Sequence, residues 1–173
     1  MKLFYTCLYH TLLDPRVSAD IDGSFSLDGK TMKDDSYIHR TVFSGWDVYR
    51  SEFPLLAIIR PDIVNDEVNS LLKIAETKNT SFPQWELLGI DTHSMVGDPG
   101  LLVVADAYLK NIRDYDTEKA YKIGLASSKC EKELFNKPFH SVRPDCKQYL
   151  ENAFVPEEFW VIPSVFANAK GES

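Results

Sequence analysis

The sequence lacks several features that would point directly to a function. Basic residues do not dominate, since 19 Lys and Arg face 26 Asp and Glu, and the net charge of −7 argues against a nucleic-acid groove, which needs a basic stripe. No apolar run approaches the ~18–20 residues that span a bilayer. A phosphate loop, a dinucleotide fingerprint and a Gly-x-Ser-x-Gly elbow are all absent. We therefore expect neither nucleic-acid binding nor a membrane span.

Cysteine is also scarce. The three cysteines, Cys7, Cys130 and Cys146, show no Cys-x-x-Cys spacing, which excludes a zinc knuckle and leaves a redox motif without support. Cys7 and His10 lie in an apolar stretch, so we expect a small core residue and a hydrogen-bonded core histidine. Cys130 and Cys146 could pair only if the segment between them doubles back. The four histidines form no His-x-x-x-His pair that would suggest a metal site.

The composition that remains is that of a globular protein. The chain has 173 residues, 44% of them hydrophobic and 26% charged, which suits one domain with a sizeable core. The residues before His10 contain no run long enough for a secretory signal, and the apolar pattern fades after Phe166. We therefore expect residues 1–173 to form a single partial domain, a piece of a larger protein.

Apolar residues recur at helical spacing in several segments. The clearest is 62–78, where one stripe is apolar and the opposite face is polar. Further helices are expected over 3–13, 46–59 with a break or new start at Pro54, 99–111, 116–127 and 145–152. Strand signals are few, so the sequence predicts an all-α fold of antiparallel helical hairpins with long connecting loops. Residues 14–43 form a long excursion with room for a short hairpin, and a loop of this length is usually functional.

The first candidate site is the string from Phe43 to Arg50. Ser44 could cap a helix whose first turn carries Trp46 and Asp47. A tryptophan beside a carboxylate suits a sugar, because the indole packs against ring C–H groups while the carboxylate accepts hydrogen bonds from hydroxyls. The same spacing fits a core tryptophan and an aspartate that compensates the helix dipole, and the residues alone leave both interpretations open.

The second candidate site is the polar loop from Trp85 to Pro99. It carries Asp91, His93 and Asp98, which could reach one cation or one sugar, although their spacing fits no metal motif. Asp98 before Pro99 also fits a helix N-cap with proline at the first helical position.

A third candidate is the string Asp20-Ile21-Asp22-Gly23. It suggests a calcium loop, but the glutamate expected at position twelve is missing and the glycine is misplaced. We therefore expect these aspartates to stabilise a turn.

Four strings in this order resemble one known family. They are Phe4-Tyr5-Thr6-Cys7-Leu8-Tyr9-His10, Asp20-Ile21-Asp22-Gly23, the string from Phe43 to Leu56, and the string from Asp106 to Asp116. Together they resemble the catalytic domain of glycoside hydrolase family 92, the calcium-dependent exo-α-mannosidases. The resemblance is best over residues 3–127 and weaker over 128–173. Its most specific part is the Phe-Ser-x-Trp-Asp string with the arginine that follows.

The resemblance implies a fold, an activity and a site. Members of the family have an N-terminal β-sandwich and a C-terminal (α/α)6 toroid with the mannose site between them, invert the anomeric centre, and use calcium to help distort the sugar. Trp46 and Asp47 then match residues that contact the terminal mannose. Asp91 becomes a further substrate-binding candidate, in a loop where members often carry Glu-Thr, and we expect this loop to lie on the same face as Trp46. The family is largely secreted or periplasmic.

The catalytic blocks of that family are missing from this chain. The resemblance implies a general acid in a Glu-Gly-Asn block, a base in a Gly-Asn-Asp block and an Asn-Glu-Pro block near the calcium, and none of the three strings occurs here. We therefore assign no catalytic residue and no calcium ligand, and expect α-mannoside glycans, the β-sandwich and the remaining toroid helices as partners. Two alternatives stay open: a truncated, non-catalytic remnant with weak or no mannoside binding, and a helical glycosidase of another family.

Overall fold

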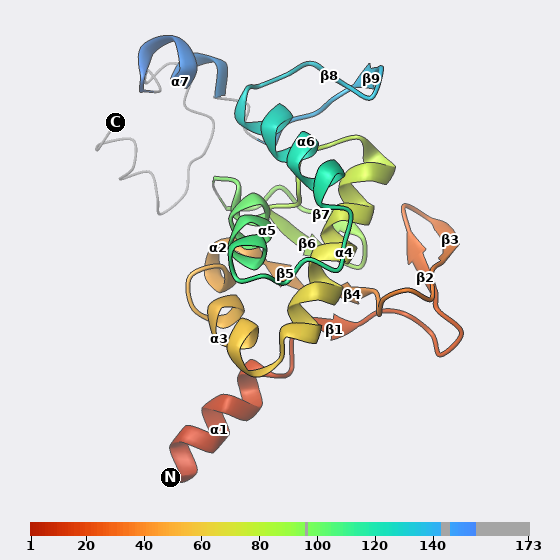
Figure 1. The fold of residues 1–173 in the computed structure, drawn as a ribbon, viewed down its shortest axis with the longest axis vertical. Helices are drawn as coiled ribbons and strands as arrows, with labels where there is room; N and C mark the ends of the chain where they lie inside the picture. The colour runs from red at the N-terminus through yellow and green to blue at the C-terminus, as the bar shows by residue number, and fades with distance from the viewer. Residues whose placement is uncertain (96, 143–145, 155–173) are drawn as a thin grey trace.

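The computed structural model of the protein describes residues 1–95, 97–142 and 146–154. These residues form seven helices and nine short strands (Figure 1). The helices are α1 (Lys2–Thr11), α2 (Gly45–Val48), α3 (Glu52–Ile59), α4 (Pro61–Lys78), α5 (Pro99–Leu109), α6 (Thr117–Ser128) and α7 (Cys146–Asn152). Within the described ranges no helix is both long and apolar enough to cross a membrane. Asp145, where the sequence predicts the last helix to begin, lies outside them.

Helix α4 is the centre of the hydrophobic core. Its buried stripe includes Val64, Val68, Leu71 and Ala75, and it packs against both α3 and α5. Side chains three and four residues apart share one helix face, so the apolar spacing predicted this helix and its buried face correctly. Burying each of the valine and leucine side chains contributes about 1.5–3 kcal/mol. The same core takes in residues of the flanking elements, among them Phe43, Phe53, Leu56, Phe82, Val103, Val104 and Ile123.

The strands show that the prediction of an all-α fold holds only in part. Four small antiparallel sheets pair β1 (Arg16–Val17) with β4 (Arg40–Thr41), β2 (Ser24–Leu27) with β3 (Lys30–Lys33), β5 (Phe43–Ser44) with β6 (Trp85–Leu87) and β7 (Ile90–Asp91), and β8 (Glu133–Leu134) with β9 (Lys137–Pro138). Strands of two to four residues are too short for the apolar alternation that marks a strand. Sequence periodicity therefore could not find them.

The hairpin of β2 and β3 confirms the one expected within residues 14–43. Asp28 and Gly29 at its tip both have positive φ, 54° and 71°, which is the backbone of the Asp-Gly hairpin turn. Phe25 and Leu27 are buried and pack against Ile74 of α4. The hairpin is thereby fixed to the central helix.

Helix α1 projects away from the rest of the molecule (Figure 1). None of its residues is buried, so the expectation that Cys7 and His10 are core residues is wrong, and both are exposed. Apolar spacing predicted the helix correctly, but it does not show whether another part of the protein buries the apolar side chains. Several of its large apolar side chains are more than half exposed, including Leu3, Phe4, Tyr5 and Tyr9.

Two predicted helix starts are confirmed. Asp98 accepts a hydrogen bond from the backbone N–H of Leu101 at 3.3 Å, and Asp116 accepts one from Lys119 at 2.9 Å. Each carboxylate thus satisfies an amide that has no partner within its helix. Asp98 also accepts the hydroxyl of Ser127 at 2.6 Å, which ties the start of α5 to α6.

Cys130 and Cys146 form a disulfide, with their Cα atoms 5.9 Å apart. The segment between them doubles back through the hairpin of β8 and β9, which is the condition that the sequence required. The bond attaches α7 to the segment that follows α6.

Candidate functional site

The first candidate string enters its helix through a close backbone contact. Gly45, the first residue of α2, donates its N–H to the carbonyl oxygen of Gln84 at 3.1 Å. A Cβ atom at this position would lie 2.5 Å from that same oxygen and from Cγ of Pro99. Only glycine therefore lets α2 start against the segment that leads into β6.

Trp46 and Asp47 lie together in α2 at the surface. Trp46 is half-buried, and the guanidinium of Arg50 lies 3.9 Å from the centroid of its ring. Asp47 is exposed, and its Oδ2 accepts the hydroxyl of Ser44 at 2.6 Å. Ser44 is the N-cap residue but its side chain caps no helix N–H. Within the described residues Asp47 Oδ1 accepts no hydrogen bond, so this oxygen can receive one from a ligand.

The carboxylate of Asp91 lies inward, with only 9% of the side chain exposed. Its Oδ2 accepts the N–H of Gln84 at 3.0 Å, and its Oδ1 accepts those of Trp85 at 3.1 Å and His93 at 3.0 Å. The ring of His93 adds a contact of 3.4 Å from Nδ1 to Oδ2. The carboxylate therefore holds the hairpin of β6 and β7 to the loop that follows.

The structure brings the two candidate strings next to each other. Ser44 is the register partner of Trp85, and Phe43 that of Glu86. Trp46 follows this paired strand by two residues, while Asp91 bonds the amide of Trp85 from the other side of the sheet. Trp46, Asp47 and Asp91 are thus linked through one small sheet, and a shared contact with a sugar stays a prediction.

The third candidate string forms a turn, as expected. Asp22 accepts the N–H and the hydroxyl of Ser24 at 3.0 and 2.9 Å, and lies 3.3 Å from Nζ of Lys33. The hydrogen bonds from Ser24, followed by that from Lys33, lower the pKa of Asp22. Across the part of the chain that the structure describes, no three His, Cys, Asp or Glu side chains gather as a metal site. These residues therefore do not fit a calcium ion.

Two buried glutamates were not identified from the sequence. Glu67 in α4 is fully buried, and its carboxyl oxygens have no hydrogen-bond partner among the described residues. Burial raises its pKa well above the usual value, and the nearby carboxyl of Glu86 raises it further, whereas Arg40 lowers it. The sequence did indicate this burial, because Glu67 stands four residues after Ile63 and four before Leu71, within the apolar stripe.

Glu86 in β6 is the second buried carboxyl, but it is well supplied with hydrogen bonds. It accepts the hydroxyl of Thr41 at 2.9 Å, the N–H of Val42 at 3.0 Å and the N–H of Gly89 at 2.6 Å. Burial raises its pKa, and these hydrogen bonds oppose that shift. Its role is to anchor β6 to the strands at its side.

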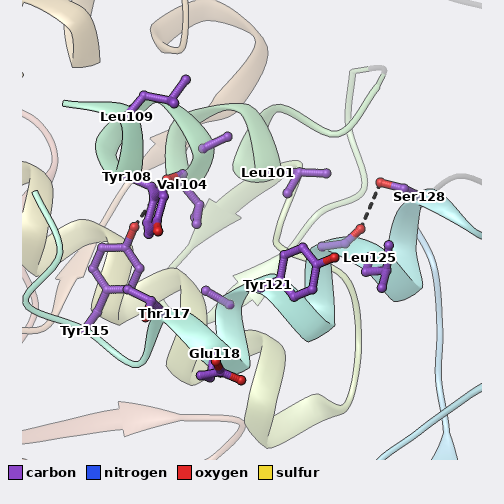
Figure 2. Close-up of a pocket in the computed structure, with 13 residues that line it drawn as sticks. Leu101, Val104, Tyr108, Leu109, Tyr115, Thr117, Glu118, Tyr121, Leu125 and Ser128 are labelled. Carbon is purple, nitrogen blue, oxygen red and sulfur yellow. Dashed lines mark hydrogen bonds between the residues drawn. The ribbon is translucent and has the colours of Figure 1, made fainter. Parts of the chain in front are cut away.

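An apolar groove of about 650 Å³ lies between α5 and α6. Figure 2 shows Leu101, Val104 and Tyr108 of α5 across from Tyr121 and Leu125 of α6. Among the described residues that line it, Glu118 is the one charged side chain. Glycoside hydrolysis needs two carboxyl groups, so this groove suits the packing of another apolar surface and not the reaction.

Comparison with known proteins places this fold. The profile of the Glycosyl hydrolase family 92 catalytic domain matches residues 1–170. The family GH92 alpha-mannosidase BT3965 from Bacteroides thetaiotaomicron is similar with a TM-score of 0.77 and 29% identity, over 90% of this chain and 20% of that chain. Its complex with mannoimidazole is similar with a TM-score of 0.75 and 30% identity, over 90% and 19% of the two chains.

A second solved protein is similar in fold. The family GH92 inverting mannosidase BT2199 from Bacteroides thetaiotaomicron VPI-5482 has a TM-score of 0.75 and 24% identity, over 89% of this chain and 21% of that chain. The chain spans about a fifth of the length of these solved relatives. A search of curated protein sequences found no match.

Proposed function

Because the chain belongs to the glycosyl hydrolase family 92 catalytic domain, we propose that it forms part of the mannose-binding wall of an enzyme that releases terminal α-linked mannose from glycans with inversion. The activity is that of a longer protein, since the chain spans about a fifth of its solved relatives. The observation that carries the proposal is the pair of half-buried Trp46 and exposed Asp47 in α2, next to the strand that Asp91 holds.

The chemistry of this pair suits a sugar. The indole of Trp46 offers an apolar face to the C–H groups of a pyranose ring. Oδ1 of Asp47 has no partner within the described residues, while Ser44 holds Oδ2 in place. A carboxylate oxygen that is pre-oriented in this way can accept a hydrogen bond from a sugar hydroxyl at little further cost in side-chain entropy.

The catalytic acid and base are proposed to come from the rest of the longer protein. An inverting glycosidase needs two carboxyl groups ~6.5–9.5 Å apart. Asp91 cannot be the base, because its oxygens already accept three backbone N–H groups. The described residues do not gather a calcium site, so we derive no step through that ion and propose that its ligands also lie in the rest of the protein.

The remaining partners are proposed to cover the apolar faces of this chain. In an (α/α)6 toroid every helix packs against neighbours. Here α1 has no buried residue, and α5 and α6 leave a groove open between them. We propose that the other toroid helices and the β-sandwich of the longer protein cover these faces.

The test is a titration of the 15N-labelled chain with methyl α-mannoside, followed by the indole N–H signal of Trp46. We predict a saturable shift that methyl α-glucoside, which differs at C2, produces only at much higher concentration. Asp47→Ala should weaken the binding by about tenfold or more, because a hydrogen bond to a charged group contributes about 1.5–3 kcal/mol.

Ser44→Ala serves as the matched control, since it removes the bond to Oδ2 and keeps the carboxylate. We expect it to weaken binding less than Asp47→Ala does. If neither sugar shifts the Trp46 signal in a saturable way, the mannose-binding wall is excluded and the chain is the non-catalytic remnant.

A further inference from the structure

The carboxylate of Asp91 is already engaged by three backbone N–H groups and is largely shielded from a ligand. Each carboxylate oxygen accepts about two hydrogen bonds. Oδ1 accepts the N–H groups of Trp85 and His93, and Oδ2 accepts that of Gln84 and lies 3.4 Å from the His93 ring. With 9% of the side chain exposed, a sugar hydroxyl would have to displace one of these N–H groups or the His93 ring.

The same bonds lead directly to the helix that carries the candidate sugar contacts. Gln84, whose N–H is held by Asp91, accepts the N–H of Gly45 on its carbonyl oxygen at 3.1 Å. Trp85, the next residue held by Asp91, is the register partner of Ser44. Asp91 therefore fixes both of the backbone groups against which α2 begins.

We propose that Asp91 is a positioning residue, which sets the place of Trp46 and Asp47 through Gln84 and Gly45 and does not itself bind the sugar. This inference rests on the proposed mannose-binding role of Trp46 and Asp47. The contact leaves little slack, because a Cβ at Gly45 would lie 2.5 Å from the Gln84 oxygen. Because Gly45 also donates its N–H to that oxygen at 3.1 Å, we expect a shift of Gln84 to move the start of α2.

The length and charge of the side chain both matter to this role. Asn would keep one acceptor oxygen but would turn an NH2 group toward a backbone N–H, so one of the three amides loses its acceptor. Glu would keep the charge but add a methylene, which displaces the carboxylate from the three amides. Both variants should therefore move α2 while leaving the rest of the fold intact.

The experiment compares Asp91→Asn with Asp91→Glu, Asp47→Asn and the wild-type chain by 15N NMR, first without ligand and then with methyl α-mannoside. Asp35→Asn is the matched control, because Asp35 is exposed and carries the same charge change. We predict that both Asp91 variants shift the Gly45 amide and the Trp46 indole signals in the absence of ligand. They should also weaken binding by roughly tenfold, the effect of losing one charge-assisted hydrogen bond.

Asp47→Asn should weaken binding and leave the ligand-free Gly45 signal unchanged. Asp35→Asn should change neither the binding nor the ligand-free Gly45 signal. Weaker binding in Asp91→Asn with unchanged ligand-free signals would mean that Asp91 touches the sugar, and would overturn the proposal.

The ligand-free comparison remains valid even if the wild-type chain binds no mannoside. The positioning role of Asp91 and the proposed mannose binding can therefore fail independently of each other. If a variant does not fold, hydrogen exchange on the wild type decides: rapid exchange of the Gln84, Trp85 and His93 amides would overturn it.

Discussion

At the scale of single residues, Arg50 covers one face of the Trp46 indole. Its guanidinium lies 3.9 Å from the ring centroid, a cation–π contact of about 0.5–1 kcal/mol at an exposed site. One face of the indole is thus covered by the protein. If Trp46 stacks on a sugar as proposed, the Arg50 guanidinium competes with that sugar for this face.

Glu67 makes the stability of the protein depend on pH. Its pKa is raised in the folded state by burial and by Glu86 and Glu52, against a lowering by Arg40. The folded protein therefore keeps a proton that the unfolded chain releases above pH ~4.5. This contribution to stability is complete below that pH and is lost as the pH rises toward the raised pKa.

We predict that Glu67→Met stabilises the protein more at pH 8 than at pH 5. Met has a similar volume and needs no hydrogen bond, so the gain at pH 8 should be about 1–3 kcal/mol, the usual cost of a buried polar group without a partner. The measurement is urea unfolding of both proteins at the two pH values. Glu131→Met, at an exposed position, is the control and should show no such dependence. A gain for Glu67→Met that is equal at both pH values would contradict the buried, protonated carboxyl.

The position of a residue could be predicted where a local string marks it, but its contacts could not be predicted where they form only in the fold. Trp46 and Asp47 stand in a distinctive string, so the sequence alone places them in α2. The three amides that Asp91 holds could not be predicted, because they come together only through the short hairpin of β6 and β7. Glu67 was missed although its helical position was visible, since a charged residue in an apolar stripe is easily assigned to the solvent face.

At the scale of elements, Asn79 joins the end of α4 to the β8–β9 hairpin. It adopts the left-handed conformation with φ of 51° that ends many helices. Its Nδ2 lies 2.7 Å from the carbonyl oxygen of Pro138 and 3.2 Å from those of Leu134 and Lys137. One side chain thereby fixes a hairpin more than fifty positions further along the chain.

We predict that Asn79→Gly and Asn79→Ala both destabilise the protein, and that Ala does so more. Gly keeps the left-handed conformation and loses only the amide bonds, at a cost of about 1–3 kcal/mol, whereas Ala adds backbone strain. Urea unfolding gives the two free energies. Hydrogen exchange at Phe139, whose N–H donates to Lys132 at 2.8 Å, reports on the hairpin itself and should accelerate in both variants. A glycine variant as stable as the wild type would show that the amide contributes nothing.

Whether an element could be predicted depended on how many residues its apolar pattern spans. Helices α4, α5 and α6 have eleven to eighteen residues, enough for an apolar stripe to recur and for a cap to be recognised. The segment 46–59 divides into α2 and α3, and the division precedes Pro54, which lies in the first turn of α3, where proline is tolerated. The short strands form only by pairing with other segments of the chain, and the local sequence does not show which segments those are.

At the scale of the whole molecule, the described chain leaves apolar surface without cover. Leu3, Phe4 and Tyr9 on α1 and Leu109 and Tyr121 beside the groove are all more than 60% exposed. Apolar patches of this kind mark surfaces that meet another protein surface. We expect the chain by itself to self-associate through them.

We propose that this chain supplies mannose contacts and lacks the catalytic pair. Protonation of the leaving oxygen and activation of water need two matched carboxyl groups, and the blocks that the resemblance implies for them do not occur in the sequence. The most direct measurement is hydrolysis of an activated aryl α-mannoside by the purified chain, with calcium and with a chelator. We predict no turnover above the uncatalysed rate under either condition. Turnover well above that rate with calcium, abolished by the chelator, would contradict the claim and place an acid and a base among these 173 residues.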